Sequence, residues 1–520
     1  MPDLIPARLD RLLFELMRDY PGPGGAVAVL REGRVVLRHA WGFANAERRI
    51  PFTPGTLFRF CSITKQFTCG LVLDAFKDPT SRDGAVSSRL PNLAEPAPGI
   101  LHLCHNQSGL RDYWALAMLQ GAAVESAFGD PEASALVRQA RSLHFKPGTR
   151  YSYVNQNFRL LSDILEAETG RGFAELLRTR IFAPAGMETA FLAADTRAMP
   201  DGTEGYEGTP ERGFRAAVNN IIWTGDAGLG ASLDDMIAWE RHIDATRDDP
   251  DALPTRLSVP VMFKDGSPAA YGFGLRRSIE FGRVAIGHGG ALRGWRSQRL
   301  YVPGERLSIV VMFNHLSDAH SAAIDLLGGI LGETSRTPAL QTAPNWLGAY
   351  VEPETGLSVR IEAADEGQVR LRYGHSAEIL ALDPDGAASD DAAIQLRALS
   401  DGLWMVRRDE NQRSRLQRID GEASLDVTGR YRCEEIDADL VVVNAGGLLH
   451  GAFTGPLGQG RMERLSPIGP DVWLLPCPRA LDHTPPGDWT LAFHRDASGD
   501  VAGLKLGCWL ARGLAYRRLG

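Results

Sequence analysis

The amino-terminal part of the chain shows two kinds of apolar periodicity. Residues 21–45 alternate apolar and polar positions on either side of Glu32-Gly33, which predicts a β-hairpin. Before them, apolar residues recur at helical spacing among charged ones, which predicts an amphipathic helix. The apolar positions of this helix are Leu9, Leu12, Leu13, Leu16, Met17 and Tyr20.

The pattern stays mixed up to residue 335. Helical spacing recurs at residues 158–168, and Ser232 is a probable helix start because Asp235 completes a Ser-x-x-Asp capping box. Strands at both ends of a helical middle predict an α+β fold. The later strands are predicted at 271–280, 283–290 and 308–315.

The pattern changes at residues 332–345, which are polar, contain proline and show no periodicity. Beyond them the chain consists of short alternating segments separated by turns. We therefore predict a multidomain protein with an α+β domain followed by two small antiparallel β-barrels. The predicted bounds are 1–335 for the first domain, 336–345 for a linker, and 346–418 and 419–520 for the barrels.

The two barrel segments show a weak internal repeat. The sequence from Gly348 resembles that from Gly429, so that Tyr350 matches Tyr431 and Glu354 matches Glu435. Two similar units rich in short strands favour closed barrels, because closure removes exposed strand edges.

Composition excludes several classes of partner. The chain has 520 residues, 44% of them hydrophobic and 23% charged, which is typical of a soluble protein with two or three domains. The net charge of −8 gives no electrostatic reason to bind nucleic acid. No apolar run reaches the length of a membrane span.

The targeting and redox signals favour the cytoplasm. Charged residues interrupt the first twenty positions, so we expect the amino terminus to be part of the fold and not a signal peptide. No Cys-x-x-Cys pair or framework spacing is present. The six cysteines are Cys61, Cys69, Cys104, Cys433, Cys477 and Cys508.

Ser62-Ile63-Thr64-Lys65 is the first candidate for chemistry. Lysine is rare here, since only five of the 56 Lys and Arg residues are Lys. Residues three apart share one helix face, so Lys65 is expected beside the Ser62 hydroxyl. A buried lysine can make a serine nucleophilic. The alternative is a solvated lysine near an ordinary serine.

The second candidate is the segment 145–161, where Tyr153-x-Asn155 follows the turn Pro147-Gly148. A nearby ammonium favours phenolate, so Tyr153 is a candidate base for Ser62. Asn155 is a candidate to bind both Lys65 and a substrate carbonyl. The alternative is a core tyrosine and a turn asparagine.

The third candidate is His288-Gly289-Gly290, at the end of a predicted strand. Glycine lets a substrate backbone approach closely. Free N–H groups at such an edge can form an oxyanion hole with the N–H of Ser62. This motif alone says little.

Together, the three motifs resemble the serine β-lactamases and penicillin-recognising peptidases, whose signature is Ser-x-x-Lys, then Ser/Tyr-x-Asn, then Lys-Thr-Gly. The order is the same, and the resemblance covers residues 1–335. It includes the amino-terminal hairpin and the stretches "TLFRFCSITK", "NQSGLRDY", "FKPGTRYSYVNQNFRLL", "AGLGASLDDM" and "YGFGL". The resemblance implies catalytic roles for Ser62, Lys65 and Tyr153.

One departure from the signature shifts the expected activity. Where relatives have Lys-Thr-Gly this chain has His288, which is mostly neutral and a weaker anchor for a carboxylate. With two appended barrels, the chain looks most like the bacterial D-aminopeptidases of this family. The resemblance implies release of D-residues from the free amino end of short peptides, amides or esters. Two alternatives are a β-lactamase-like esterase or D,D-peptidase and a non-catalytic ligand receptor.

An aminopeptidase needs an acid for the substrate ammonium, and none of the three motifs contains one. The loop 477–488 is long for a hairpin and rich in proline, and no counterpart is evident in the first barrel. We predict that this loop reaches the active site and that Asp482 binds the ammonium. The alternative is a solvated surface loop.

No cofactor or metal is expected. His102 and His105 are close in sequence but lack a third ligand nearby. The expected partner is a small peptide or amide substrate, without nucleic acid or membrane. The oligomeric state stays open, with a homodimer as the assembly we consider.

Overall fold

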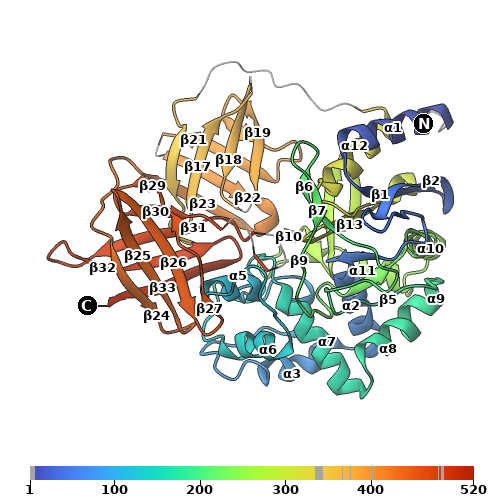
Figure 1. Ribbon diagram of the computed structural model, residues 1–520, viewed down its shortest axis with the longest axis horizontal. Helices are drawn as coiled ribbons and strands as arrows, with labels where there is room; N and C mark the ends of the chain where they lie inside the picture. Colours follow the sequence, from blue (N-terminus) through green and yellow to red (C-terminus); the bar gives the residue numbers. More distant parts are fainter. Residues whose placement is uncertain are drawn as a thin grey trace.

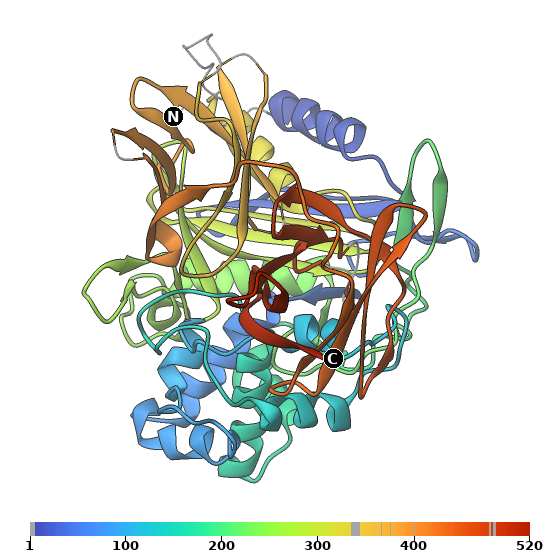
Figure 2. The same ribbon diagram turned by 90° about the vertical axis from the view of Figure 1, so that its left-hand side faces the viewer.

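The computed structural model shows an α+β region beside two all-β regions (Figure 1). Turning the molecule brings the two carboxy-terminal regions to the front, with the light blue and teal helices of the first region at the bottom of the view (Figure 2). The structure describes residues 6–333, 344–365, 367–374, 376–400, 402–477, 480–481 and 485–519.

An eight-stranded antiparallel sheet forms the centre of the first region. The predicted hairpin is confirmed, with β1 and β2 joined through Glu32-Gly33. In sheet order the strands are β11 (Tyr271–Gly272), β12 (Leu275–Glu280), β13 (Arg283–Leu292), β14 (Trp295–Val302), β15 (Leu307–Phe313), β1 (Gly24–Arg31), β2 (Arg34–Asn45) and β3 (Ile50–Pro51).

Both faces of this sheet are buried, which explains its apolar central strands. On β1, Val27 and Val29 face one core, in which the apolar sides of α1 (Pro6–Asp19) and α12 (Ala319–Leu331) pack. The alternate residues Ala26, Ala28 and Leu30 face the main core. The amphipathic helix predicted at the amino terminus is therefore confirmed.

Helices between β3 and β11 pack on the other face of the sheet. Ser232 caps α10 with Asp235 in the predicted capping box. The larger helices are α2 (Thr64–Ala75), α5 (Tyr113–Leu119), α6 (Asp130–Gln139), α7 (Asn155–Thr169) and α10 (Leu233–Thr246). Shorter ones are α3 (Asp83–Ser87), α4 (Ile100–Cys104), α8 (Phe173–Leu177), α9 (Ala183–Ala185) and α11 (Leu253–Leu257). Short strands among them are β4 (Phe58–Cys61), β5 (Phe191–Leu192), β6 (Tyr206–Thr209), β7 (Gly213–Ala216), β8 (Leu229–Ala231), β9 (Val261–Met262) and β10 (Pro268–Ala269).

The first all-β region is a closed eight-stranded barrel. Closure comes from the first and last strands, where Tyr350 pairs with Arg418. Its strands are β16 (Gly348–Val351), β17 (Ser358–Ala363), β18 (Gln368–Arg372), β19 (Ala377–Asp383), β20 (Gly386–Ala388), β21 (Ile394–Leu399), β22 (Gly402–Arg407) and β23 (Gln412–Arg418).

The second all-β region is a ten-stranded curved sheet that forms a half-barrel. Among its described residues, no strand pairing joins the ends β27 and β29. Its strands are β24 (Gly429–Cys433), β25 (Ala438–Ala445), β26 (Leu448–Gly455), β27 (Gly458–Gln459), β28 (Glu463–Arg464), β29 (Ser466–Gly469), β30 (Val472–Leu475), β31 (Trp489–Arg495), β32 (Val501–Cys508) and β33 (Ala511–Leu519).

The predicted repeat has a structural counterpart. Tyr350 lies on β16 and Tyr431 on β24, and each is buried at the start of its own β region. The Tyr350 hydroxyl donates to the carbonyl of Trp346 at 2.6 Å, and the Tyr431 hydroxyl to the carbonyl of Val427 at 2.7 Å. The domain boundaries within this arrangement stay a proposal, and most of the predicted linker lies outside the described residues.

Candidate active site

Ser62 lies at the junction of β4 and α2. The sequence predicted it on a helix, but α2 begins at Thr64, so only Lys65 stands in the first helical turn. The preceding Cys61 has a φ of 51°, a conformation rare for residues other than glycine. This sharp turn sets half-buried Ser62 ahead of the helix amino terminus, where the helix dipole favours negative charge.

Lys65 is fully buried and its ammonium group is hydrogen-bonded. Its Nζ donates to Ser62 Oγ at 3.0 Å, to Asn155 Oδ1 at 2.9 Å and to the backbone carbonyl of Asp226 at 2.7 Å. An ammonium has three donors and no acceptor. The three acceptors therefore match a protonated Lys65.

Tyr153 is the second group that contacts Ser62. Its hydroxyl lies 2.7 Å from Ser62 Oγ, and Lys65 Nζ lies 4.8 Å from the centre of its ring. The predicted neighbourhood of Ser62, Lys65 and Tyr153 is thus present in the structure. A phenolate at this position would face both the proton to be removed and a stabilising positive charge.

Asn155 begins α7, which starts three residues before the predicted start at Phe158. Its side-chain amide both accepts and donates a hydrogen bond. Oδ1 accepts from Lys65, while Nδ2 donates to Asp112 Oδ2 at 3.0 Å. An amide nitrogen carries two hydrogens, so the bond to Asp112 uses one of the two side-chain donors of Asn155.

His288 lies in the middle of β13, and not at the end of a strand as the sequence suggested. Its Nδ1 is 2.6 Å from the carbonyl of Gly289 and its Nε2 is 3.0 Å from the Tyr271 hydroxyl. Because a carbonyl only accepts, Nδ1 carries the proton. Burial lowers the pKa of His288 to about 3, with a further contribution from the Lys65 charge. The ring is neutral at physiological pH.

The glycines after His288 have different surroundings. Within the described residues, β12 pairs with β13 only as far as Gly287, so β13 beyond this point has no strand partner on that side. A Cβ on Gly290 would lie 2.1 Å from the carbonyl oxygen of Phe60, just before Ser62. Gly290 therefore permits β13 to approach the nucleophile turn closely.

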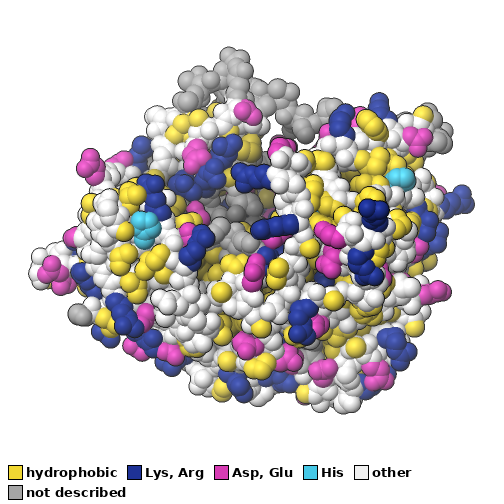
Figure 3. Space-filling view, in the orientation of Figure 1, with side chains coloured by type: hydrophobic (Ala, Val, Ile, Leu, Met, Phe, Trp, Pro, Cys, Tyr) yellow, Lys and Arg dark blue, Asp and Glu magenta, His cyan; other side chains and the backbone are white. Residues whose placement is uncertain are grey.

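A cavity of about 500 Å³ opens over Ser62, and all three regions of the chain line it. The space-filling view shows that the molecule is hollowed where these regions meet (Figure 3). The catalytic region contributes Ser62, Tyr153, Asn155, Trp223, His288, Gly289, Gly290 and Asp318 among others. The closed barrel contributes Ser376, and the half-barrel region contributes Pro485, Trp509 and Leu510.

A second hollow of about 520 Å³ shares Tyr153, His288 and Gly289 with this cavity. Arg276 lies on its wall and forms an ion pair with Asp409 of the first barrel at 2.6 Å. Tyr153 therefore lines two adjoining cavities.

Sequence reasoning missed three residues around the nucleophile. Asp112 and Asp226 are fully buried behind Asn155 and Lys65, and Tyr271 holds His288. Asp112 lies in the stretch "NQSGLRDY", so that stretch contained a signal. Asp226 acts through a backbone carbonyl, which no side-chain pattern reveals.

The predicted ammonium site is described only in part. Asp482 lies outside the described residues, so its position is untested. Pro485, from the same loop, lines the cavity, while Asp488 lies 3.7 Å from Arg360 of the first barrel. In the described part of the chain, no cluster of three His, Cys, Asp or Glu residues suits a metal ion.

The sequence of this chain is similar to family models and to known proteins. Two family models match, β-lactamase over residues 9–331 and "D-aminopeptidase, domain B" over residues 339–517. The chain is 58% identical to a D-aminopeptidase of Gluconobacter oxydans (strain 621H), with 100% of both chains covered. The chain belongs to the D-aminopeptidase family. A D-aminopeptidase of Brucella canis is 48% identical, also with 100% of both chains covered.

Solved structures support the fold of this D-aminopeptidase family member. A D-amino acid amidase from Ochrobactrum anthropi SV3 matches with a TM-score of 0.53 and 19% identity, over 63% of this chain and 99% of that one. An octameric penicillin-binding protein homologue from Pyrococcus abyssi matches with a TM-score of 0.52 and 20% identity, over 86% and 95%. The predicted family, fold class and serine hydrolase activity are confirmed. Among the described residues, no helix is both long and apolar enough to cross a membrane.

Proposed function

We propose that this D-aminopeptidase family member releases D-residues from the free amino end of short peptides, amides or esters through an acyl-enzyme on Ser62. The arrangement of Lys65 carries the proposal. Its ammonium has three acceptors, one of which is Ser62 Oγ, and Tyr153 contacts the same oxygen at 2.7 Å. Lys65 is thus suited to supply charge, and Tyr153 to move protons.

The reaction proceeds in two halves. Tyr153 takes the proton of Ser62 as the serine oxygen attacks the substrate carbonyl. Backbone N–H groups of Ser62 and of β13 near Gly290 stabilise the oxyanion, and Tyr153 then returns the proton to the leaving amine. In the second half, Tyr153 takes a proton from water as the water oxygen attacks the acyl-enzyme carbonyl. Tyr153 then returns this proton to Ser62 Oγ, and the D-amino acid is released.

The substrate's free ammonium is bound by the loop 477–488, with Asp482 as the acid. Support comes from Pro485, which places the described end of this loop at the cavity wall. The neighbouring hollow beyond His288 accommodates the leaving part of a peptide. His288 is buried and neutral, so it does not favour the carboxylate recognition that a D,D-peptidase requires.

The reaction is tested with D-alanine amide and its L-isomer. Wild type is expected to release ammonia from the D-isomer only. Ser62→Ala is expected to lose nearly all turnover, and mass spectrometry with a slow ester is expected to show one adduct on the Ser62 peptide. An active Ser62→Ala variant would contradict the acyl-enzyme mechanism.

The remaining predictions concern the cell and assembly. We keep the cytoplasm as the proposed location. A small peptide or amide is the proposed partner. A homodimer and a reaction without cofactor or metal stay predictions.

A further inference from the structure

Two of the three acceptors of Lys65 are held by consecutive residues. Asn155, whose Oδ1 accepts from Lys65, is bound by Asp112. Asp226, whose carbonyl accepts from Lys65, receives a hydrogen bond of 2.5 Å on its carboxylate from the Tyr113 hydroxyl. The nucleophile's lysine therefore rests on groups that depend on one short segment, Arg111–Tyr113, which we call the 111–113 segment.

Asp112 has the chemistry needed to orient Asn155. The carboxylate is fully buried, and its Oδ2 accepts from the backbone N–H of Asn155 at 2.6 Å and from its Nδ2 at 3.0 Å. An ionised carboxylate accepts hydrogen bonds and donates none. It therefore fixes the amide with its nitrogen toward Asp112 and its oxygen toward Lys65.

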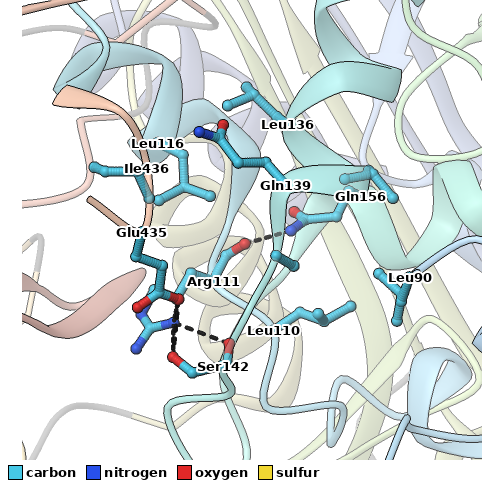
Figure 4. A pocket seen from close by; sticks show the side chains of 12 residues that line it. Leu90, Leu110, Arg111, Leu116, Leu136, Gln139, Ser142, Gln156, Glu435 and Ile436 are labelled. Carbon is cyan, nitrogen blue, oxygen red and sulfur yellow. Dashed lines mark hydrogen bonds and ion pairs between the residues drawn. The ribbon is translucent and has the colours of Figure 1, made fainter. Parts of the chain in front are cut away.

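The same segment grips the next residue of α7. The Tyr113 backbone N–H donates to Gln156 Oε1 at 2.8 Å, and the Arg111 carbonyl accepts from Gln156 Nε2. The contact of Arg111 with Gln156 is drawn in Figure 4. The first turn of α7 is thus held through both backbone and side chain.

The half-barrel holds the other side of this segment. The Asp112 N–H donates to the carbonyl of Leu510 at 3.0 Å, and Arg111 Nε donates to the carbonyl of Arg512 at 2.8 Å. Arg111 also forms a partly buried ion pair with Glu435 at 3.0 Å (Figure 4). A hydrogen-bonded path therefore joins this region to Ser62 through Asp112, Asn155 and Lys65.

We propose that the 111–113 segment couples the half-barrel to the catalytic lysine, with Asp112 as the positioning residue. The half-barrel then supports turnover itself, in addition to any part that its loop has in choosing substrates. The proposal rests on the proposed roles of Ser62, Lys65 and Asn155.

The first test is Asp112→Asn. An asparagine at this position replaces one carboxylate oxygen by an NH₂ donor. If the NH₂ takes the place of Oδ1, it faces the Trp114 N–H, which now donates to Asp112 Oδ1 at 3.0 Å. If the NH₂ takes the place of Oδ2, the Asn155 amide must flip and turn its own NH₂ toward Lys65. We expect kcat for D-alanine amide to fall about ten- to a hundredfold with KM within about threefold. Ser232→Ala removes the cap of α10, and the side-chain partners of Ser232 are Thr189 and Asp235 and not residues of the site. It controls for loss of a helix cap and is expected to keep kcat.

A double-mutant cycle separates positioning from general damage. If Asp112 acts through Asn155, Asp112→Asn has little further effect on kcat in the Asn155→Ala background. Additive losses, or an unchanged kcat in Asp112→Asn, overturn the positioning role. Should Ser62→Ala also stay active, the proposed function itself fails, so the two failures are distinguishable.

The second test uses the repeat. Glu435→Gln breaks the pair with Arg111, which is 7% exposed, while Glu354→Gln breaks the matching pair with Arg150, where the glutamate is 58% exposed. We expect Glu435→Gln to lower kcat about three- to tenfold and Glu354→Gln to leave it unchanged. Equal kcat in both variants overturns the coupling to the half-barrel.

Discussion

At the scale of single residues, Asp112 orients the amide that contacts Lys65: Asn155 Nδ2 donates to Asp112 Oδ2 at 3.0 Å, and Asn155 Oδ1 accepts from Lys65 Nζ at 2.9 Å. Ser62, Lys65, Tyr153 and Asn155 lie in short motifs whose spacing indicates their chemistry. Asp112 contacts Asn155 from 43 positions away, and such a distance in sequence leaves no periodic signal. Burial of a carboxylate is visible only once the fold is known.

Lys65 and Tyr153 are expected to act as one unit. A phenolate is useful only beside the ammonium, so losing either group removes the same function. Tyr153→Phe and Lys65→Met should each lower kcat strongly, and the double variant should be little worse than either. Steady-state kinetics on D-alanine amide measures this. A Tyr153→Phe enzyme with near-normal kcat would move the base elsewhere, Lys65 being the next candidate.

The pH dependence should reveal Asp112. Burial raises its pKa from 3.8 to about 6, against hydrogen bonds from Asn155 and Trp114 and the charge of Lys65, which lower it. Because the acceptor-only form orients Asn155, kcat should fall as pH drops through about 6. This limb should be lost in Asp112→Asn.

The contribution of Asp112 to the free energy of unfolding should change with pH in the opposite direction to kcat. A raised pKa means that the folded state binds the proton more tightly, so the contribution of Asp112 is most favourable below pH 3.8 and is lost as pH rises through about 6. The loss is on the order of 3 kcal/mol for the shift from 3.8 to about 6. Urea unfolding of wild type and Asp112→Asn across this range measures it. A constant difference in unfolding free energy would contradict the assignment.

At the scale of elements, periodicity predicted the helices and strands better than their ends. The hairpin, α1 and the capping box of α10 follow local rules and match the sequence prediction. The position of His288 does not, because pairing with β14 continues β13 past the glycines. The start of α7 does not either: it lies at Asn155, whose backbone N–H donates to Asp112, which lies outside the helix. Tertiary pairing decided these limits.

Gly290 should be intolerant of a side chain. A Cβ there would meet the Phe60 carbonyl at 2.1 Å, which forces β13 away from the Ser62 turn. Gly290→Ala is expected to lower kcat at least about tenfold, since an oxyanion donor moves. Gly304→Ala, at a site with nothing within 4 Å of the added Cβ, is the matched control. If both variants turn over D-alanine amide normally, the close approach has no catalytic role.

At the scale of the whole molecule, each of the two all-β regions forms an ion pair with the catalytic region through the repeated glutamate. The equivalent residues Glu354 and Glu435 both bind an arginine of the catalytic region, at Arg150 and Arg111. In the sequence, Arg150 lies shortly before Tyr153, and Arg111 lies directly before Asp112. The sequence revealed the repeated glutamates, but their partners are hundreds of residues away and could not be predicted from local pattern.

The loop 477–488 provides the test of specificity. Leu475 pairs with Trp489 across β30 and β31, so an Asn-Gly turn can replace residues 476–488 while keeping the strand register. If the loop is the ammonium anchor and also blocks longer substrates, as proposed, its deletion should lower activity on free D-amino-acid amides while amino-blocked peptides or penicillins gain access. Thermal unfolding checks that the variant is folded, since Ala480 and Leu481 are buried.

Asp482→Asn should separate the anchor from the wall. It removes the proposed charge-assisted contact of Asp482, which would be worth on the order of 1.5 to 3 kcal/mol, or about ten- to over a hundredfold in kcat/KM for a free amine. Amino-blocked substrates should stay excluded in this variant, because the wall remains. Rates on D-alanine amide and its N-acetyl form measure both effects. If neither variant changes the preference for a free amine, the catalytic region itself binds the ammonium, and the 111–113 segment would be the main link between the half-barrel and catalysis.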